Sequence, residues 1–271
     1  MGRLHIQFPG RMYSERASSF TPSGAARYLP LRGRLKNGDV CMDRKALAKT
    51  MDHTILKATA TPEQVKTICL EAIEIGAASV CVNPANIALA RSLLEDSDVK
   101  VCSVVGFPLG ANTTESKAFE TRDAVTKGAD EIDMVINVGA LLAGDSVSVL
   151  KDIKAVVEAS EGALVKVIIE TCYLDDDQKQ LACVLAKEAG ADFVKTSTGF
   201  GTGGATVSDI KLMREAVGNE MKVKASGGIR DFTAAVEMLE ASADRLGVSA
   251  SLTILDCVDR NEKPGSAADN Y

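Results

Sequence analysis

The stretch GADFVKTSTGFG, residues 190–201, contains a junction that recurs along the chain. A glycine and a small residue, typical of the end of a helix, precede a short apolar run that is typical of a buried strand. The junction returns as GAA at 76–78, as GAD at 128–130 and, with serine in place of glycine, as SAD at 242–244. These positions are 52, 62 and 52 residues apart, or about two strand–helix units. The repeat therefore predicts a regular alternation of helices and strands.

Eight strand-like runs support this pattern. They cover residues 51–56, 79–83, 99–107, 131–137, 164–171, 192–197, 221–228 and 244–249. Helical patterns fill the gaps. In one of them, Thr61 and Gln64 can form a capping box, and Gly76 can end the helix. Eight strands alternating with helices over ~210 residues predict a single-domain (β/α)8 TIM barrel. A doubly wound open sheet is the alternative, and the strand count favours the barrel.

The two ends of the chain do not follow this alternation. We expect the barrel at 42–258, an N-terminal extension at 1–41 and a C-terminal tail at 259–271. The extension shows no sustained period, and its basic residues outnumber Glu15 and Asp39. We interpret it as a flexible segment or as a translation start assigned too early. An Arg-rich, acid-poor organelle-targeting leader that is later removed is the alternative.

Composition and charge restrict the class of function. The net charge of −6 argues against nucleic acid or an anionic membrane as partner. The longest apolar run, around VKVIIE, is far shorter than the ~20 residues of a membrane span. Seven cysteines occur without a C-x-x-C pair, which favours a reducing compartment such as the cytoplasm. The only histidines, His5 and His53, disfavour a histidine-based zinc site or catalytic triad.

Charged residues recur on the barrel side of four consecutive strands. Along each strand, side chains alternate between the helix layer and the barrel interior, and the apolar half must face the helices. The charged residues directed inward are Glu131, Asp133, Lys166, Glu170, Lys195, Lys222 and Lys224. For Lys166 and Glu131, an internal ion network that fills the barrel is at least as good an interpretation as catalysis. Asp133, Lys195 and Lys224 lie nearer the C-terminal ends of their strands, where active sites of this fold lie.

Lys195 and Lys224 suggest a specific chemistry. They lie at similar heights on consecutive strands, whose axes are roughly 4.8 Å apart. Two ammonium groups this close repel each other, and repulsion and desolvation both lower the pKa of a lysine. A partly neutral lysine can attack a carbonyl and form a Schiff base. Asp133 can hold the second lysine charged or move protons through a water, which adds a general acid–base group.

Three loops that follow the sixth, seventh and eighth strands suggest the substrate. They read TSTGFGTGG (196–204), ASGGIR (225–230) and GVSAS (247–251). Phosphate sites in such barrels typically occur after strands seven and eight, at exposed backbone N–H groups. Glycine-rich loops alone are weak evidence. Beside the lysine pair, they indicate a phosphorylated small molecule.

With these residues together, the sequence resembles the deoxyribose-phosphate aldolases, a family of class I (Schiff-base) aldolases. The resemblance runs from Asp52 to Ser251. Eight motifs carry it: DHTILK (52–57), VCVNP (80–84), VVGFPLG (104–110), GADEIDMVIN (128–137), VKVIIET (165–171), FVKTSTGFG (193–201), VKASGGIR (223–230) and LGVSAS (246–251). No single motif is sufficient, but eight in the right order are specific.

The resemblance implies reversible cleavage of 2-deoxy-D-ribose 5-phosphate to D-glyceraldehyde 3-phosphate and acetaldehyde. It makes Lys195 the Schiff-base lysine, Lys224 the partner that lowers its pKa, and Asp133 part of the proton relay. The substrate-binding residues that it implies are Asp52, Thr54, Thr198, Gly199, Gly227, Gly228 and Ser249. It implies neither a metal nor an organic cofactor, in agreement with the scarcity of histidine. It also implies a homo-oligomer, a dimer or a tetramer.

Two positions limit the resemblance. Ala250 stands where many family members have a second consecutive serine, and Ser251 is the candidate replacement in the phosphate site. Tyr271 resembles a C-terminal tyrosine that some members fold back into the active site. Two other functions stay open: a Schiff-base aldolase for a ketose or a longer sugar phosphate, and a catalytically silent barrel that binds or scaffolds. The two mutually repelling lysines argue against the silent barrel.

Overall fold

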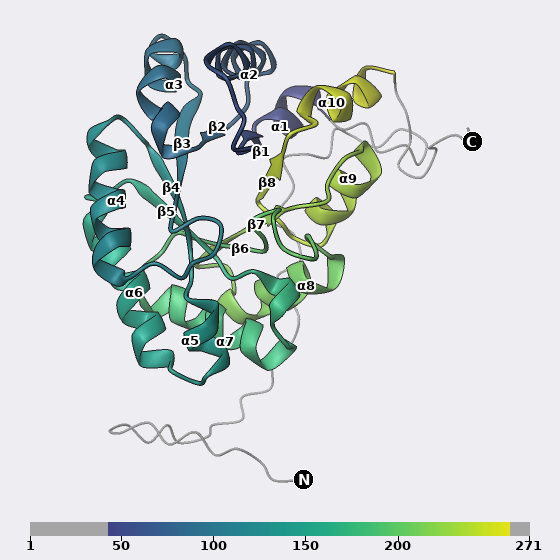
Figure 1. Ribbon diagram of the computed structural model, residues 1–271. Helices are drawn as coiled ribbons and strands as arrows, with labels where there is room; N and C mark the ends of the chain where they lie inside the picture. The colour runs from purple at the N-terminus through teal and green to yellow at the C-terminus, as the bar shows by residue number, and fades with distance from the viewer. Residues whose placement is uncertain (1–42, 261–271) are drawn as a thin grey trace. The chain divides into compact units, whose positions relative to one another are not determined.

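The structure, a computed structural model, describes residues 43–260, in which eight parallel strands close into a barrel (Figure 1). Hydrogen bonds join each strand to the next and join the last strand to the first. The strands are β1 (Met51–Ile55), β2 (Ser79–Val82), β3 (Lys100–Val105), β4 (Glu131–Val135), β5 (Leu164–Ile168), β6 (Phe193–Lys195), β7 (Lys222–Ser226) and β8 (Arg245–Val248). The prediction of a (β/α)8 barrel is confirmed, and the open-sheet alternative is wrong.

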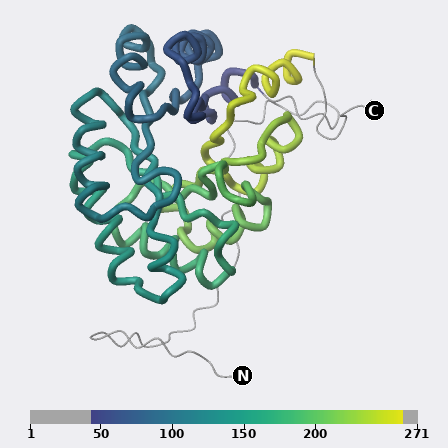
Figure 2. Tube along the Cα trace, viewed as in Figure 1, coloured from purple at the N-terminus to yellow at the C-terminus, as the bar shows by residue number. Residues whose placement is uncertain are grey.

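Helices surround the barrel and connect its strands. They are α1 (Arg44–Ala48), α2 (Pro62–Ile75), α3 (Ile87–Leu94), α4 (Thr114–Thr126), α5 (Val138–Leu142), α6 (Ser146–Ala159), α7 (Asp176–Glu188), α8 (Val207–Val217), α9 (Phe232–Glu240) and α10 (Ser251–Asp259). Two 3-10 turns add to them, η1 (Pro84–Asn86) and η2 (Thr171–Tyr173). The chain winds once around the barrel, so the purple α1 and the yellow α10 lie side by side (Figure 2). An ion pair of 3.0 Å joins Arg44 to Asp259 there.

Local sequence signals set the bounds of α2. Thr61 accepts a hydrogen bond from the backbone of Gln64, and the Gln64 side chain accepts one from the backbone of Thr61. Gly76 ends the helix with a φ of 70°, a left-handed conformation that favours glycine. The predicted capping box and helix end are therefore confirmed.

The strands are shorter than their sequence patterns, and this difference positions the site. The run at 164–171 ends as a strand at Ile168, because Glu170 adopts a φ of 54° and turns the chain. The run at 192–197 contributes only three residues to the sheet. Lys195 is consequently the last residue of β6, at the C-terminal end of the barrel.

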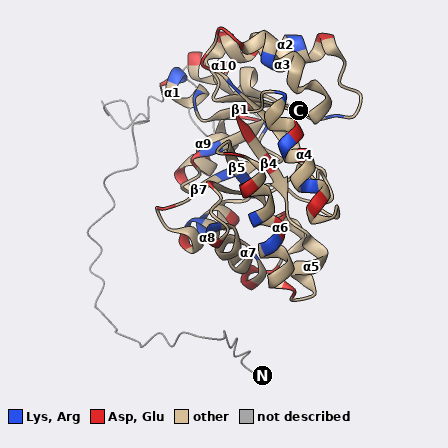
Figure 3. Cartoon of the chain, turned by 90° about the vertical axis from the view of Figure 1, so that its left-hand side faces the viewer, with Lys and Arg blue, Asp and Glu red and all other residues tan. Residues whose placement is uncertain are grey.

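The core lies between the barrel and the helices. Val165, Val167 and Ile169 face the helices and are almost completely buried, as the alternation predicts. Charged groups occupy the barrel interior, which burial permits only when they are paired. On the outer helices, basic and acidic residues intermingle (Figure 3). The apolar layer thus holds the barrel together while the interior carries the ionic groups.

Three expectations fall outside the described residues. These are the N-terminal extension at 1–41, most of the tail at 259–271, and the placement of Tyr271. Within residues 43–260, no helix has the length and apolar character needed to cross a membrane.

Candidate active site

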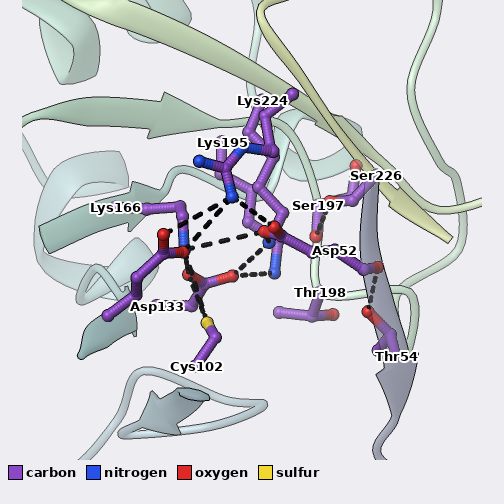
Figure 4. Close-up of polar contacts among 12 residues, drawn as sticks. Asp52, Thr54, Cys102, Asp133, Lys166, Lys195, Ser197, Thr198, Lys224 and Ser226 are labelled. Carbon is purple, nitrogen blue, oxygen red and sulfur yellow. Dashed lines mark hydrogen bonds and ion pairs between the residues drawn. The ribbon is translucent and has the colours of Figure 1, made fainter. Parts of the chain in front are cut away.

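Lys195 and Lys224 lie next to each other at the C-terminal end of the barrel. The register of β6 and β7 pairs Lys195 directly with Lys224. Both side chains are buried, and each Nζ lies 2.7 Å from the same carboxylate oxygen, Oδ2 of Asp133. Figure 4 shows Asp133 reaching these two ammonium groups from β4. The structure therefore brings together the three residues that the sequence singled out for catalysis.

Asp52 extends the cluster beneath Lys224. It is completely buried on β1, and one of its carboxylate oxygens, Oδ2, forms an ion pair with the Lys224 ammonium. The other oxygen lies 2.5 Å from the guanidinium of Arg245 on β8. Thr54, two residues along β1, donates its hydroxyl to the Asp52 carbonyl at 2.8 Å. Asp52 thus holds the Lys224 ammonium through one carboxylate oxygen, and Arg245 holds Asp52 through the other.

Lys166 belongs to the same cluster. Its Nζ lies 2.7 Å from Asp133 Oδ1 and 2.5 Å from Glu131 Oε2. The Cys102 thiol lies 3.3 Å from the same nitrogen. Sequence alternation directed Lys166 and Glu131 inward but left them in a separate internal network. The structure joins that network to the candidate site through the two oxygens of Asp133.

The pKa shifts in the cluster follow from burial and pairing. Burial opposes charge on Lys224, but Asp133 and Asp52 raise its pKa well above the ordinary lysine value. Burial likewise opposes charge on Lys166. The attraction of nearby groups, Asp133 most of all, outweighs this effect and raises the pKa of Lys166. Burial acts to raise the pKa of Asp133, yet Lys166, Lys195 and Lys224 hold it well below its usual range. Lys166, Lys224 and Asp133 are therefore charged near neutral pH.

The number of charges in the cluster is unequal. Four cationic side chains meet three carboxylates in the ion pairs of this cluster. The cations are Lys166, Lys195, Lys224 and Arg245, and the carboxylates are Asp52, Glu131 and Asp133. With every group ionised, the cluster carries one positive charge in excess. A neutral amine on one lysine would balance it, and an unbalanced buried charge is costly.

A cavity of about 600 Å³ opens above the cluster. Of the four cations, Lys195 is the one that lines it. Asp52, Asp133 and Lys224 are completely buried beneath the cavity rather than in its wall. The other predicted site residues that line it are Thr54, Thr198, Gly199, Gly227, Gly228 and Ser249. The cavity wall also includes Lys57 and Arg230, which lie outside the cluster, so the cluster itself presents one amine to a small molecule and buries that amine's charged partners.

The glycine-rich loops form one side of this cavity. Gly227 and Gly228 adopt φ values of 84° and 81°, which only glycine reaches without strain. Gly204 packs so closely on the Gly227 carbonyl that a Cβ there would collide with it. The Ser226 hydroxyl also donates to the Ser197 carbonyl at 2.6 Å. The loops after β6 and β7 are thus held together as one unit.

Glu170 is a residue whose role sequence reasoning missed. It is buried after β5 and accepts hydrogen bonds from both the backbone N–H and the hydroxyl of Thr198, the latter at 2.5 Å. The Thr198 hydroxyl in turn accepts from the backbone N–H of Phe200 at 3.0 Å. Glu170 thereby holds the loop that follows Lys195. Its inward position by strand alternation was the available signal.

Ser251 does not take the place of a missing phosphate-binding serine. It is completely buried at the first position of α10, and its hydroxyl lies 2.8 Å from His53 Nδ1. Ser249 is the exposed serine of this loop and lines the cavity. Ala250 occupies the N-cap of α10, where no side chain caps the helix.

Lys222 differs from the expectation that placed it inside with Lys224. It is the first residue of β7, at the N-terminal edge of the barrel, and it is exposed. Its ammonium lies 5.4 Å from the centroid of the Phe193 ring. The side chain follows the predicted alternation, but it lies at the N-terminal end of the barrel and is accessible to water.

Two buried groups of side chains have the donor types of a metal site. In each, the ligand atoms of three residues lie within 4.8 Å of one another. The groups are Cys81, Cys102 and Asp133, and Asp52, Cys102 and Glu131. Ammonium and guanidinium groups already bind the carboxylates of both. A metal ion would have to displace these cations, so the residues fit an ion-paired cluster better than a metal centre.

Comparison with known proteins agrees with this geometry. A model described as DeoC/LacD family aldolase matches residues 45–256. A deoxyribose-phosphate aldolase of Alkaliphilus oremlandii is 63% identical over 211 residues, covering 78% of this chain and 95% of the relative. One from Clostridium perfringens is 60% identical over 216 residues, covering 79% and 96%.

Solved structures resemble the fold as well. A putative deoxyribose-phosphate aldolase from Coccidioides immitis superposes with a TM-score of 0.77 at 41% identity, covering 80% of this chain and 87% of that one. The deoxyribose phosphate aldolase from Aeropyrum pernix, described as having a unique tetrameric structure, gives 0.75 at 34% identity, covering 80% and 92%.

Proposed function

This chain belongs to the DeoC/LacD family of aldolases, and from that premise we propose that it cleaves 2-deoxy-D-ribose 5-phosphate through a Schiff base on Lys195. The products are D-glyceraldehyde 3-phosphate and acetaldehyde, and the reaction is reversible. The family resemblance of the eight motifs is thereby confirmed. One observation carries the assignment of the nucleophile: Lys195 alone among the clustered cations lines the cavity, and it shares Asp133 Oδ2 with Lys224.

The first step makes a carbon–nitrogen bond. The neutral amine of Lys195 attacks the C1 aldehyde of the open-chain sugar, and the resulting carbinolamine loses water to give an iminium ion. Lys195 is the amine of the cluster that reaches the cavity, whereas the other three cations are buried among carboxylates beneath it. The iminium formed at Lys195 restores a positive charge beside Asp133, whose carboxylate stabilises it.

The second step breaks a carbon–carbon bond. The C3 hydroxyl loses its proton, the C2–C3 bond cleaves, and its electron pair flows into the iminium to leave an enamine. D-glyceraldehyde 3-phosphate then departs. Protonation of the enamine carbon restores an iminium, and water hydrolyses it to acetaldehyde and free Lys195. Asp133, with the Lys224 ammonium and a water molecule, exchanges these protons.

The phosphate of the substrate binds at the glycine-rich side of the cavity. Gly199, Gly227 and Gly228 offer a backbone that a ligand can approach closely, and Ser249 adds an exposed hydroxyl. Thr54 and Thr198 add two further hydroxyl-bearing side chains to the cavity wall. Asp52 acts indirectly, by holding Lys224 against Asp133. A ketose or longer sugar phosphate is the second candidate substrate, supported by the size of the cavity.

We also propose that the protein assembles with copies of itself in the cytoplasm. A homo-oligomer, a dimer or a tetramer, is supported by the tetrameric structure described for the Aeropyrum pernix relative. A cytoplasmic location is supported by the six free cysteines among residues 43–260. Light scattering of the purified protein would measure the oligomeric state, and a monomer at assay concentration would contradict the first proposal.

Borohydride trapping tests the function directly. The protein is incubated with 2-deoxy-D-ribose 5-phosphate, reduced with borohydride and mapped by mass spectrometry. We expect a reduced adduct at Lys195 and none in Lys195→Met, while Lys222→Met, which alters the exposed lysine at the other end of the barrel, keeps the adduct. An adduct elsewhere overturns the nucleophile, and an adduct formed only with a ketose phosphate favours the second substrate. No adduct with either sugar supports the silent barrel.

A further inference from the structure

His53 occupies an unusual place for a histidine. It lies on β1 between Asp52 and Thr54. Because side chains alternate along a strand, these two neighbours point to the opposite face from His53. Since Asp52 enters the interior cluster, His53 projects to the helix layer, where an apolar residue is the ordinary choice. The residue is 2% exposed, yet it borders the cavity. A polar side chain at this position needs hydrogen-bond partners.

Both ring nitrogens of His53 are engaged. Nε2 lies 2.8 Å from a carboxylate oxygen of Glu71 on α2, and Nδ1 lies 2.8 Å from the Ser251 hydroxyl on α10. A carboxylate oxygen accepts hydrogen bonds, so Nε2 carries a hydrogen and donates it in a hydrogen bond to Glu71. When Nε2 carries the only ring hydrogen, Nδ1 accepts a hydrogen bond from the Ser251 hydroxyl. One side chain thereby connects β1, α2 and α10.

The segment that His53 anchors borders the cavity. Gly247, Val248 and Ser249 line it immediately before α10. The register of β1 and β8 pairs His53 with Val248, so the backbone fixes one side of this turn. The hydrogen bond to Ser251 fixes the other side, at the first residue of the helix. Ala250 lies between them and offers no side-chain cap, so Ser251 is the nearest side-chain attachment for the helix start.

We propose that His53 is a positioning residue for the phosphate group of the substrate. It holds the β8–α10 turn, Gly247 to Ala250, through Ser251, and Glu71 holds its ring in the required orientation. This rests on the proposed function, because a phosphorylated substrate is what the turn receives. The exposed Ser249 and the first backbone N–H groups of α10 then meet the phosphate without a rearrangement that would weaken binding.

Variants that remove the hydrogen bonds of His53 should affect binding of the phosphate and leave the chemistry at Lys195 unchanged. The Ser251→Ala variant removes one hydrogen bond of His53, Glu71→Gln weakens the other, and His53→Gln removes the ring. Matched controls are Thr253→Ala on α10 and Glu74→Gln on α2, both at exposed positions of the same helices. Each protein is assayed with 2-deoxy-D-ribose 5-phosphate and with unphosphorylated 2-deoxy-D-ribose, and binding of inorganic phosphate is measured by calorimetry.

For Ser251→Ala we expect KM for the phosphorylated sugar and Kd for inorganic phosphate to rise by about five-fold, the effect of one net hydrogen bond. We expect kcat to stay unchanged, together with kcat/KM for 2-deoxy-D-ribose. Glu71→Gln and His53→Gln should change the same two quantities, and the controls neither. Equal losses on both sugars, or an unchanged phosphate Kd, overturn the role of His53. If the wild-type protein cleaves neither sugar, the proposed function is contradicted. The Kd for inorganic phosphate then still tests the role of His53.

Discussion

Lys195 and Lys224 bind the same carboxylate oxygen, Asp133 Oδ2, each at a distance of 2.7 Å. The two pairs are not equivalent, because Lys224 also binds Asp52. Among the described residues, Lys195 has Asp133 as its one ion-pair partner. Lys195 therefore has fewer carboxylate partners than Lys224, and of the two it is the one that borders the cavity. This asymmetry supports our proposal that Lys195, rather than Lys224, is the nucleophile.

Removal of Lys224 should make Lys195 less reactive at neutral pH. In Lys224→Leu the cluster loses its excess positive charge, so three carboxylates retain three cations and, within the described part of the chain, Lys195 becomes the one ammonium bound to Asp133 Oδ2. We expect the pH at which the adduct forms half-maximally to rise, and kcat to fall by at least about 100-fold near pH 7, an acid–base effect of ordinary size. The pH dependence of borohydride trapping measures the shift.

The exposed Lys222 on the same strand provides the control for that variant. Lys222→Leu removes a cation that lies over the Phe193 ring, outside the ion-paired cluster. Its adduct should form with the pH dependence of the wild type. An unchanged profile in Lys224→Leu, or an equal shift in both variants, would contradict the coupling between Lys195 and Lys224.

Lys166 should matter for stability as much as for catalysis. Lys166→Met leaves Asp133 Oδ1 and Glu131 without the cation that binds both, and breaking a buried ion pair costs about 3–5 kcal/mol. Urea denaturation should show this loss in the free energy of unfolding. Lys154→Met, at an exposed pair with Glu188, should cost at most about 1 kcal/mol. Equal effects of the two substitutions would show that Lys166 is not an essential partner.

Acid should destabilise the protein through Asp52 and Asp133. Cations hold the pKa of both carboxyls below the unfolded value, which is about 4. Their contribution is therefore complete above that value and is lost as the pH falls toward the folded pKa. Calorimetry should show the melting temperature falling as the pH drops below about 4. Asp52→Asn should flatten this part of the curve, and a variant as acid-sensitive as the wild type would exclude Asp52 as a contributor.

Gly204 should be essential for the shape of the substrate cavity. In Gly204→Ala the new Cβ would collide with the Gly227 carbonyl, which forces apart the loops after β6 and β7. We expect KM for the phosphorylated sugar to rise by about ten-fold or more, a cost of overpacking in the usual range. Gly139→Ala on α5 meets no such obstacle and should leave KM unchanged. A Gly204→Ala enzyme with normal KM would show that the two loops need not touch.

Chelation should leave the activity intact. The carboxylates of both candidate donor groups already bind ammonium or guanidinium groups, and a Schiff base requires no Lewis acid. Dialysis against EDTA should therefore preserve kcat for sugar cleavage. Loss of activity that zinc or magnesium restores would contradict a mechanism based on Lys195 alone.

The barrel and the adjacency of Lys195 and Lys224 could be predicted from the sequence because their signals are short patterns within single strands. Strand alternation fixes the side on which Asp133, Lys195 and Lys224 project. The order of strands in a closed parallel barrel makes the sixth and seventh neighbours. The register then places Lys195 opposite Lys224. Each of these steps needs only a few consecutive residues and the rules of the fold.

The remaining contacts depend on the stagger of the strands and the packing of the helices. His53 and Ser251 are 198 positions apart, and their hydrogen bond exists because β1 meets β8 where the barrel closes. Lys166 reaches both Asp133 and Glu131 only because the register of β4 and β5 places it beside the first and above the second. No short sequence pattern encodes such distances. They follow from the closed geometry of the whole barrel.

The brevity of β6 has a consequence for altering this protein. With only Phe193, Val194 and Lys195 in the sheet, the Lys195 amine is attached to the hydrogen-bonded barrel. The proposed substrate contacts that follow Lys195 along the chain, Thr198 and Gly199, lie beyond the last residue of this strand. Substitutions in this loop that leave Thr198 and Gly204 in place can therefore alter the substrate range while Lys195 stays in register, so that a library restricted to 199–203 explores new substrates without changing the ion-paired cluster.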